Sequence, residues 1–125
     1  AEKVGYTAYG NLVMSDYGHH PSEIAPTLEA LRPQDSDTKF VVVFQPHQYS
    51  RTRELLSDFA DVFGAADTLI IPDIYFSRDK AEDVSWMTVD RLVEVIRPHQ
   101  PNIRNGNGLK STKDLLLKMD QAHPA

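Results

Sequence analysis

The chain has 125 residues, no cysteine and a formal net charge of −5 at pH 7. This length suits one domain that buries its own core, and the lack of cysteine excludes disulfides and thiolate metal sites. No apolar run reaches the roughly 18 residues that a membrane span needs. An acidic chain also lacks the basic face of a general nucleic-acid binder. We therefore expect a cytoplasmic domain that binds neither membrane nor nucleic acid.

The amino-terminal third predicts a hairpin followed by a helix. Gly5–Ser15 has the pattern of a hairpin, with a turn at Gly10-Asn11 and a buried strand from Leu12. A helix is expected over Pro21–Arg32, because a proline at the first helical position lacks only an N–H that has no partner inside the helix. The apolar residues of this helix recur at helical spacing and form one stripe, which consists of Ile24, Leu28 and Leu31.

Beyond residue 39, β-type runs alternate with amphipathic helical runs. Strands are predicted at 40–44, 68–71 and 102–104, the first two as apolar runs typical of sheets covered on both faces. Helices are predicted at 51–63, 84–97 and 111–121, the last capped by Ser111 or Thr112. A charged loop is expected at 78–83. The alternation predicts an α/β fold with an open, mostly parallel, Rossmann-like sheet and helices on both faces. Residues 1–125 form one domain, which ends on a helix and could lack a final strand.

Two polar loops follow predicted strands, at Asp16–Pro21 and Gln45–Arg53. Ligands of open parallel sheets bind beyond the carboxyl ends of the strands, so these loops should meet over a crevice if their strands are neighbours. Together they carry eight side chains with acid, imidazole, phenol or guanidinium groups: Asp16, Tyr17, His19, His20, His47, Tyr49, Arg51 and Arg53. Two helix amino termini with free N–H groups should point at the same place. The crevice should therefore favour an anion.

Several of these side chains also have a structural explanation. Asp16 could cap a turn, and Arg53 could be a surface charge of its helix. His20 fits a helix cap better than a ligand contact, and neighbours on an extended segment face opposite ways, so His19 and His20 should not line one site together. No metal site is expected, because the paired histidines lack metal-ligand spacing. Trp86 fits a core or interface anchor.

Other signatures of chemistry are missing from the sequence. There is no Walker-type phosphate loop and no recognisable nucleophile elbow, and Gly106-Asn107-Gly108 is only a fragment of a dinucleotide-binding motif. Tyr75 and Phe76 follow the 68–71 strand at the same sheet edge, where they could line a pocket or simply pack the loop. The residues alone therefore predict an anion-binding crevice without its own catalytic machinery.

The segments DYGHHPSEI at 16–24 and FQPHQYSRTRELLSDFADVF at 44–63 resemble the two signature blocks of the UDP-N-acetylmuramate–L-alanine ligases, within the Mur ligase family. EKVG at 2–5 and ADTLIIPDIY at 66–75 match as well. A related murein-tripeptide ligase has a different second block and is the weaker match. The resemblance implies the carboxy-terminal domain of a three-domain enzyme. The other two domains would hold the UDP-sugar and, in the central domain, the ATP loop and magnesium ligands.

The family reaction forms an acyl phosphate from UDP-N-acetylmuramate and ATP, and the amino group of L-alanine then attacks it. By resemblance, Asp16 would bind the ATP ribose. The amino-acid and acyl-phosphate side would be lined by Tyr17, His19, His47, Gln48, Tyr49 and Arg51. The candidate catalytic groups among these are Arg51, His19 and His47. Because ATP and magnesium would be held mainly by the central domain, the resemblance implies that this domain is inactive alone.

Two departures from the family pattern stand out. Gln48 occupies a position where the family usually has arginine, which weakens a two-arginine clamp on the alanine carboxylate unless Arg53 faces the crevice. The family also continues past the last helix into a further strand, so we expect a piece of a longer protein. Two other classes stay open from the residues: a stand-alone module that binds a nucleotide or anion, and an interaction domain whose crevice is incidental.

Overall fold

The strands form one sheet in which neighbours in sequence are also neighbours in space. The computed structural model describes residues 3–6, 12–17, 20–34 and 37–122. The five strands, in sheet order, are β1 (Lys3–Tyr6), β2 (Leu12–Tyr17), β3 (Phe40–Gln45), β4 (Thr68–Ile71) and β5 (Ile103–Asn105). β1 runs antiparallel to β2, and the other neighbours are parallel. The predicted α/β fold with a mostly parallel sheet is therefore confirmed.

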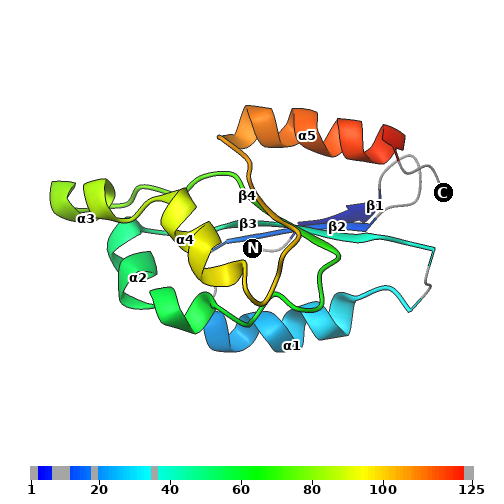
Figure 1. The fold of residues 1–125 in the computed structure, drawn as a ribbon, viewed down its shortest axis with the longest axis horizontal. Coiled ribbons are helices and arrows are strands. Elements are labelled where there is room, and N and C mark those ends of the chain that lie inside the picture. The colour runs from blue at the N-terminus through cyan, green and yellow to red at the C-terminus, as the bar shows by residue number, and fades with distance from the viewer. Residues whose placement is uncertain (1–2, 7–11, 18–19, 35–36, 123–125) are drawn as a thin grey trace.

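Helices cover both faces of this sheet, as predicted (Figure 1). They are α1 (Pro21–Leu31), α2 (Tyr49–Glu54), the 3-10 helix η1 (Leu56–Phe59), α3 (Ala81–Trp86), α4 (Val89–Ile96) and α5 (Leu109–Ala122). In Figure 1, α1, α2 and α4 lie below the sheet and α5 lies above it. Successive right-handed crossovers in one direction place their helices on one face, which accounts for the unequal cover.

The core divides between the two faces because strand side chains alternate. Phe40, Val42 and Phe44 of β3 point into the larger cluster, where they meet residues of α1, η1 and α4. Val41 and Val43 point the other way, under α5. The rings of Phe59 and Phe63 both pack on Phe44, with centroids 5.6 and 5.2 Å away. This side-chain packing fixes the end of β3, where the second polar loop begins.

Two predicted helices are each broken in the structure. The prediction of one helix over 51–63 is wrong beyond Glu54, because the backbone leaves α-helical geometry at Leu55 and continues as η1. Its second half holds Ser57, Asp58 and Asp61, whose short polar side chains compete for backbone groups and disfavour helix. The helix predicted at 84–97 is split into α3 and α4. The Thr88 hydroxyl accepts the Arg91 N–H at 3.2 Å and so starts a new helix.

Smaller boundaries also differ from the sequence prediction. The loop predicted at 78–83 ends at Lys80, because α3 begins at Ala81. The last helix begins at Leu109. Neither Ser111 nor Thr112 caps that helix; the Thr112 hydroxyl instead donates to the Gly108 carbonyl at 2.7 Å. The predicted hairpin is confirmed by the pairing of Tyr6 with Leu12, whereas its turn at Gly10-Asn11 lies outside the described residues. None of the helices in the described residues is long and apolar enough to span a membrane.

Candidate functional site

The two polar loops leave the same edge of the sheet from adjacent strands. β2 and β3 are parallel neighbours, and their last residues pair Asp16 with Phe44 and Tyr17 with Gln45. The condition for a shared crevice is therefore met. Asp16 and Tyr17 occupy the last two positions of β2, but the described part of the structure does not include their side chains or His19. The roles assigned to these three residues stay predictions.

The β3–α2 loop is held by the loop that follows β4. The Tyr75 N–H donates to the Pro46 carbonyl at 2.8 Å, and the Gln48 N–H donates to the Tyr75 carbonyl at 2.7 Å. These bonds continue the parallel pairing of the sheet past the strand ends, with His47 opposite Tyr75. The imidazole of His47 stacks on the Tyr75 ring, with centroids 4.8 Å apart. Tyr75, which the sequence left between pocket and packing roles, thus contacts a candidate catalytic residue.

Both the backbone and the side-chain amide of Gln48 are constrained. Its φ of 76° lies in the left-handed region, which is uncommon for a residue other than glycine. The side-chain Nε2 donates to the Ser77 carbonyl at 3.1 Å. One amide donor of Gln48 is therefore engaged by the neighbouring loop, and substrate binding by Gln48 stays a prediction.

The amino terminus of α2 is occupied by Asp79. The N–H groups of Tyr49 and Ser50 donate to its two carboxylate oxygens at 2.9 and 2.8 Å. The expectation of free N–H groups at this helix end is therefore wrong. At the amino end of α1, His20 accepts the Ser22 N–H at 3.1 Å, which confirms the structural reading of His20. Positive charge for an anion must then come from side chains.

Arg53 turns toward α3. Its guanidinium approaches Asp83 at 3.2 Å and Glu82 at 3.5 Å, and it lies 4.4 Å from the centroid of the Trp86 ring. Arg91 lies over the same ring at 4.6 Å. Trp86 packs against the larger core cluster and joins α2, α3 and α4, as an anchor residue was expected to. Arg53 is thus committed to contacts between helices.

Arg51 lines a pocket of about 260 Å³ between the end of β3 and α2. The lining residues are Phe44, Pro46, His47, Arg51, Thr52, Leu55 and Phe59. The buried Thr52 hydroxyl is satisfied by the Gln48 carbonyl at 2.7 Å. Within the described side chains, Arg51 forms no ion pair. The pocket lining combines apolar side chains with a guanidinium and an imidazole.

The charges of two carboxylates, Asp73 and Asp79, act on the Tyr49 phenol. Asp73 accepts a hydrogen bond from the Gln45 amide at 2.5 Å, just past the end of β4. Burial raises the pKa of Tyr49 above its ordinary 10.0, and the charges of Asp73 and Asp79 raise it further. Tyr49 is therefore a neutral phenol that can donate a hydrogen bond at neutral pH.

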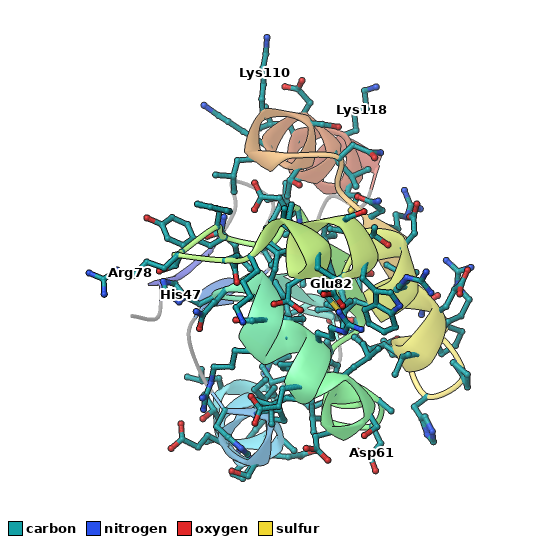
Figure 2. All side chains as sticks on the ribbon, turned by 90° about the vertical axis from the view of Figure 1, so that its left-hand side faces the viewer. His47, Asp61, Arg78, Glu82, Lys110 and Lys118 are labelled. Carbon is teal, nitrogen blue, oxygen red and sulfur yellow. The ribbon has the colours of Figure 1, made fainter. Side chains whose placement is uncertain are left out.

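Figure 2 looks onto this edge of the molecule, with His47 and Arg78 on the same side and the Arg78 side chain extending outward. Among the residues whose side chains are described, no three histidines or carboxylates gather in a way that could hold a metal ion. Sequence reasoning missed Asp79 as part of the site and left Tyr75 between a pocket role and a packing role. Both act across loops some 30 residues apart in the chain, and no local spacing marks such a contact.

Comparison with known proteins places the chain in a family. The family model described as "Mur ligase, glutamate ligase domain" matches residues 2–121. The chain belongs to the Mur ligase family. The family resemblance drawn from the two loops is thereby confirmed, and the Rossmann-like sheet with helices on both faces is the fold of this Mur ligase domain.

The relatives of this Mur ligase domain include proteins named UDP-N-acetylmuramate–L-alanine ligase. The one from Geobacter sp. (strain M21) is 45% identical over 92 residues, which are 74% of this chain and 20% of the relative. The one from Caldanaerobacter subterraneus subsp. tengcongensis is 48% identical over 87 residues, or 70% of this chain and 18% of the relative. The chain thus spans about a fifth of the length of the curated relatives it matches.

Proposed function

We propose that this Mur ligase domain is the carboxy-terminal domain of a ligase that joins L-alanine to UDP-N-acetylmuramate in peptidoglycan synthesis, in the cytoplasm. The names of its relatives support the reaction. The observation that carries the proposal is the pocket beside the paired ends of β2 and β3, which Arg51 and His47 both line. An amino acid brings a carboxylate, and a guanidinium binds carboxylates with two parallel hydrogen bonds.

In the proposed reaction, the carboxylate of UDP-N-acetylmuramate takes the γ-phosphoryl group of ATP, releasing ADP. The alanine amine attacks the acyl phosphate, an amide forms, and inorganic phosphate leaves. Arg51 binds an anionic group and offsets its charge, while the ring nitrogens of His47 can donate or accept a hydrogen bond. Tyr49 and Gln48 would contact the amino acid, together with Tyr17 and His19 from the other loop. Asp16, at the end of β2, would bind the ribose of ATP.

The described side chains hold no set of magnesium ligands, and the sequence has no phosphate loop. In keeping with the family resemblance, magnesium and the ATP phosphates would be held mainly by another domain of the parent chain, and the UDP-sugar by a third. The 125-residue domain contributes ribose and amino-acid contacts only. It should show no alanine-dependent ATP hydrolysis by itself.

The test is Arg51→Ala in the full-length parent, measured as alanine-dependent release of phosphate. We expect kcat/KM for L-alanine to fall by roughly a hundredfold, the usual cost of removing one donor to a developing charge. Arg97→Ala is the matched control, because Arg97 is an exposed arginine just after α4. Equal activity of the Arg51 and Arg97 variants would contradict the proposal and favour an incidental crevice.

One further substrate and one binding experiment separate the alternatives. A parent that joins a tripeptide, and not L-alanine, to UDP-N-acetylmuramate would be the related murein-tripeptide ligase. Calorimetry of the 125-residue chain with ATP, UDP-N-acetylmuramate, L-alanine and an unrelated nucleotide tests the stand-alone module. Tight binding of the unrelated nucleotide would favour that module over the ligase domain.

A further inference from the structure

The Asp79 carboxylate accepts hydrogen bonds from three backbone N–H groups, two in α2 and one in its own loop. Its carboxylate accepts the N–H groups of Tyr49 and Ser50 in the first turn of α2, and that of Ser77 in its own loop at 3.1 Å. Burial alone would raise the pKa of Asp79, but these backbone hydrogen bonds lower it below its ordinary 3.8. The carboxylate is therefore ionised at neutral pH, the form that accepts such bonds most strongly.

The backbone on each side of this contact is strained. Gln48, directly before Tyr49, has a φ of 76°, and Arg78, directly before Asp79, has a φ of 53°. Residues other than glycine occupy this region at a cost in free energy, and they persist only where surrounding contacts fix them. The Asp79 bonds and the Gln48–Ser77 bond are the contacts that do so here.

α2 depends on this external cap. It has only six residues, and isolated helices of that length do not form in water. Its own N-cap residue, Gln48, provides no side-chain hydrogen bond to the helix. Asp79, about 30 residues away in sequence, supplies the missing acceptor. Tyr49 and Arg51 both lie in the helix that this carboxylate caps. The position of the Asp79 carboxylate therefore determines the positions of Tyr49 and Arg51.

We propose that Asp79 is a positioning residue that caps α2 from the neighbouring loop and so holds Tyr49, and Arg51 at the pocket, in place. The inference rests on the proposed function for its kinetic consequence, because the substrate of the pocket is assigned there. The Asp79 carboxylate could act on amino-acid binding in two opposite ways. As a positioning residue it favours binding of the amino acid, whereas as a mere negative charge beside Arg51 it would oppose binding of an anion.

The kinetic test uses Asp79→Asn in the full-length parent, with Asp61→Asn as the matched control. Asp61 is an exposed carboxylate at the opposite end of this face of the molecule (Figure 2). We expect the KM for L-alanine to rise about tenfold to a hundredfold, because small misplacement of a binding group has effects of this size. The KM for ATP should stay within about twofold, since this domain holds little of ATP. An unchanged or lower KM for L-alanine would overturn the proposal.

A second variant covers the case in which Asp79→Asn does not fold. Asp79→Glu keeps the charge but moves the carboxylate by one methylene, so it should give an intermediate KM for L-alanine. A wild-type KM in a folded Asp79→Glu variant, alongside an Asp79→Asn variant that only unfolds, would reduce Asp79 to a stability role and overturn the proposal.

An independent measurement on the 125-residue chain separates this inference from the proposed function. Amide hydrogen exchange at Tyr49 and Ser50 should become faster in Asp79→Asn, whereas exchange at Val42 in β3 should not change. If the parent shows no alanine-dependent turnover, the proposed function fails, and the exchange result still decides whether Asp79 caps α2. Unchanged protection at Tyr49 and Ser50 would refute the cap itself.

Discussion

The ring of Tyr75 lies parallel to the imidazole of His47, with an angle of 16° between their planes. The stack sits on two backbone hydrogen bonds that join Pro46 and Gln48 to Tyr75. These hydrogen bonds hold the backbone of both residues in place, although Tyr75 is 51% exposed. The half-exposed Tyr75 ring therefore contacts His47, a residue that lines the pocket.

Replacing Tyr75 should disturb the pocket through His47. Tyr75→Ala removes the stacking partner, and such ring pairs contribute about 0.5–1.5 kcal/mol beyond the area they bury. We expect kcat/KM for L-alanine in the full-length parent to fall about tenfold, while Tyr75→Phe keeps the ring and most of the activity. Phe76→Ala is the control, because Phe76 is the next residue and is also exposed. Equal losses at Tyr75 and Phe76 would contradict the special role of the stack.

Asp79 should make the stability of the 125-residue chain depend on pH in a defined window. Its folded-state pKa lies below the unfolded value, so its contribution is complete above the ordinary value of 3.8 and is lost as the pH falls through the lower folded value. Urea midpoints of wild type and Asp79→Asn should differ at pH 7 and converge below pH 3.8. A difference between the two midpoints that stays constant down to strongly acidic pH would contradict an ionised cap.

The parallel sheet and the position of both loops after strands could be predicted because both depend on local pattern and chain order. The apolar run from Phe40 to Phe44 marks a central strand, and short crossovers place successive strands side by side. The adjacency of β2 and β3, which the sequence left as a condition for the shared edge, agrees with those rules. The stripe of Ile24 and Leu28 likewise predicted the buried face of α1.

The details of the site could not be predicted, because they depend on contacts between distant segments. Nothing near Tyr49 in sequence shows that Asp79 occupies the end of α2. The orientation of Arg53 toward Asp83 and Trp86 depends on where α3 lies, which helical periodicity does not determine. The break at Leu55 was also hidden, because the apolar spacing of the segment is compatible with one continuous helix.

Gly106 should tolerate no side chain at the junction of β5 and α5. A Cβ there would collide with the Thr112 hydroxyl and would lie 3.1 Å from the Pro72 Cα atom. We expect Gly106→Ala to lower the free energy of unfolding by about 1–3 kcal/mol, the usual cost of overpacking a tight site. Gly64→Ala is the matched control, since nothing lies within 4 Å of a Cβ at that position. A Gly106→Ala variant as stable as Gly64→Ala would contradict the close packing of this junction.

Arg53 should matter for the attachment of α3 and not for recognition of the substrate. Arg53→Ala removes its contacts with Asp83 and the Trp86 ring, which together should contribute about 1 kcal/mol because the side chain is partly exposed. Thermal unfolding of the 125-residue chain measures this loss, and Arg53→Lys should recover part of it, because lysine keeps the charge but not the flat guanidinium. The KM for L-alanine in the parent should stay within about twofold. A large rise in that KM, similar to the effect of Arg51→Ala, would mean that Arg53 reaches the amino acid and leaves α3 during the reaction.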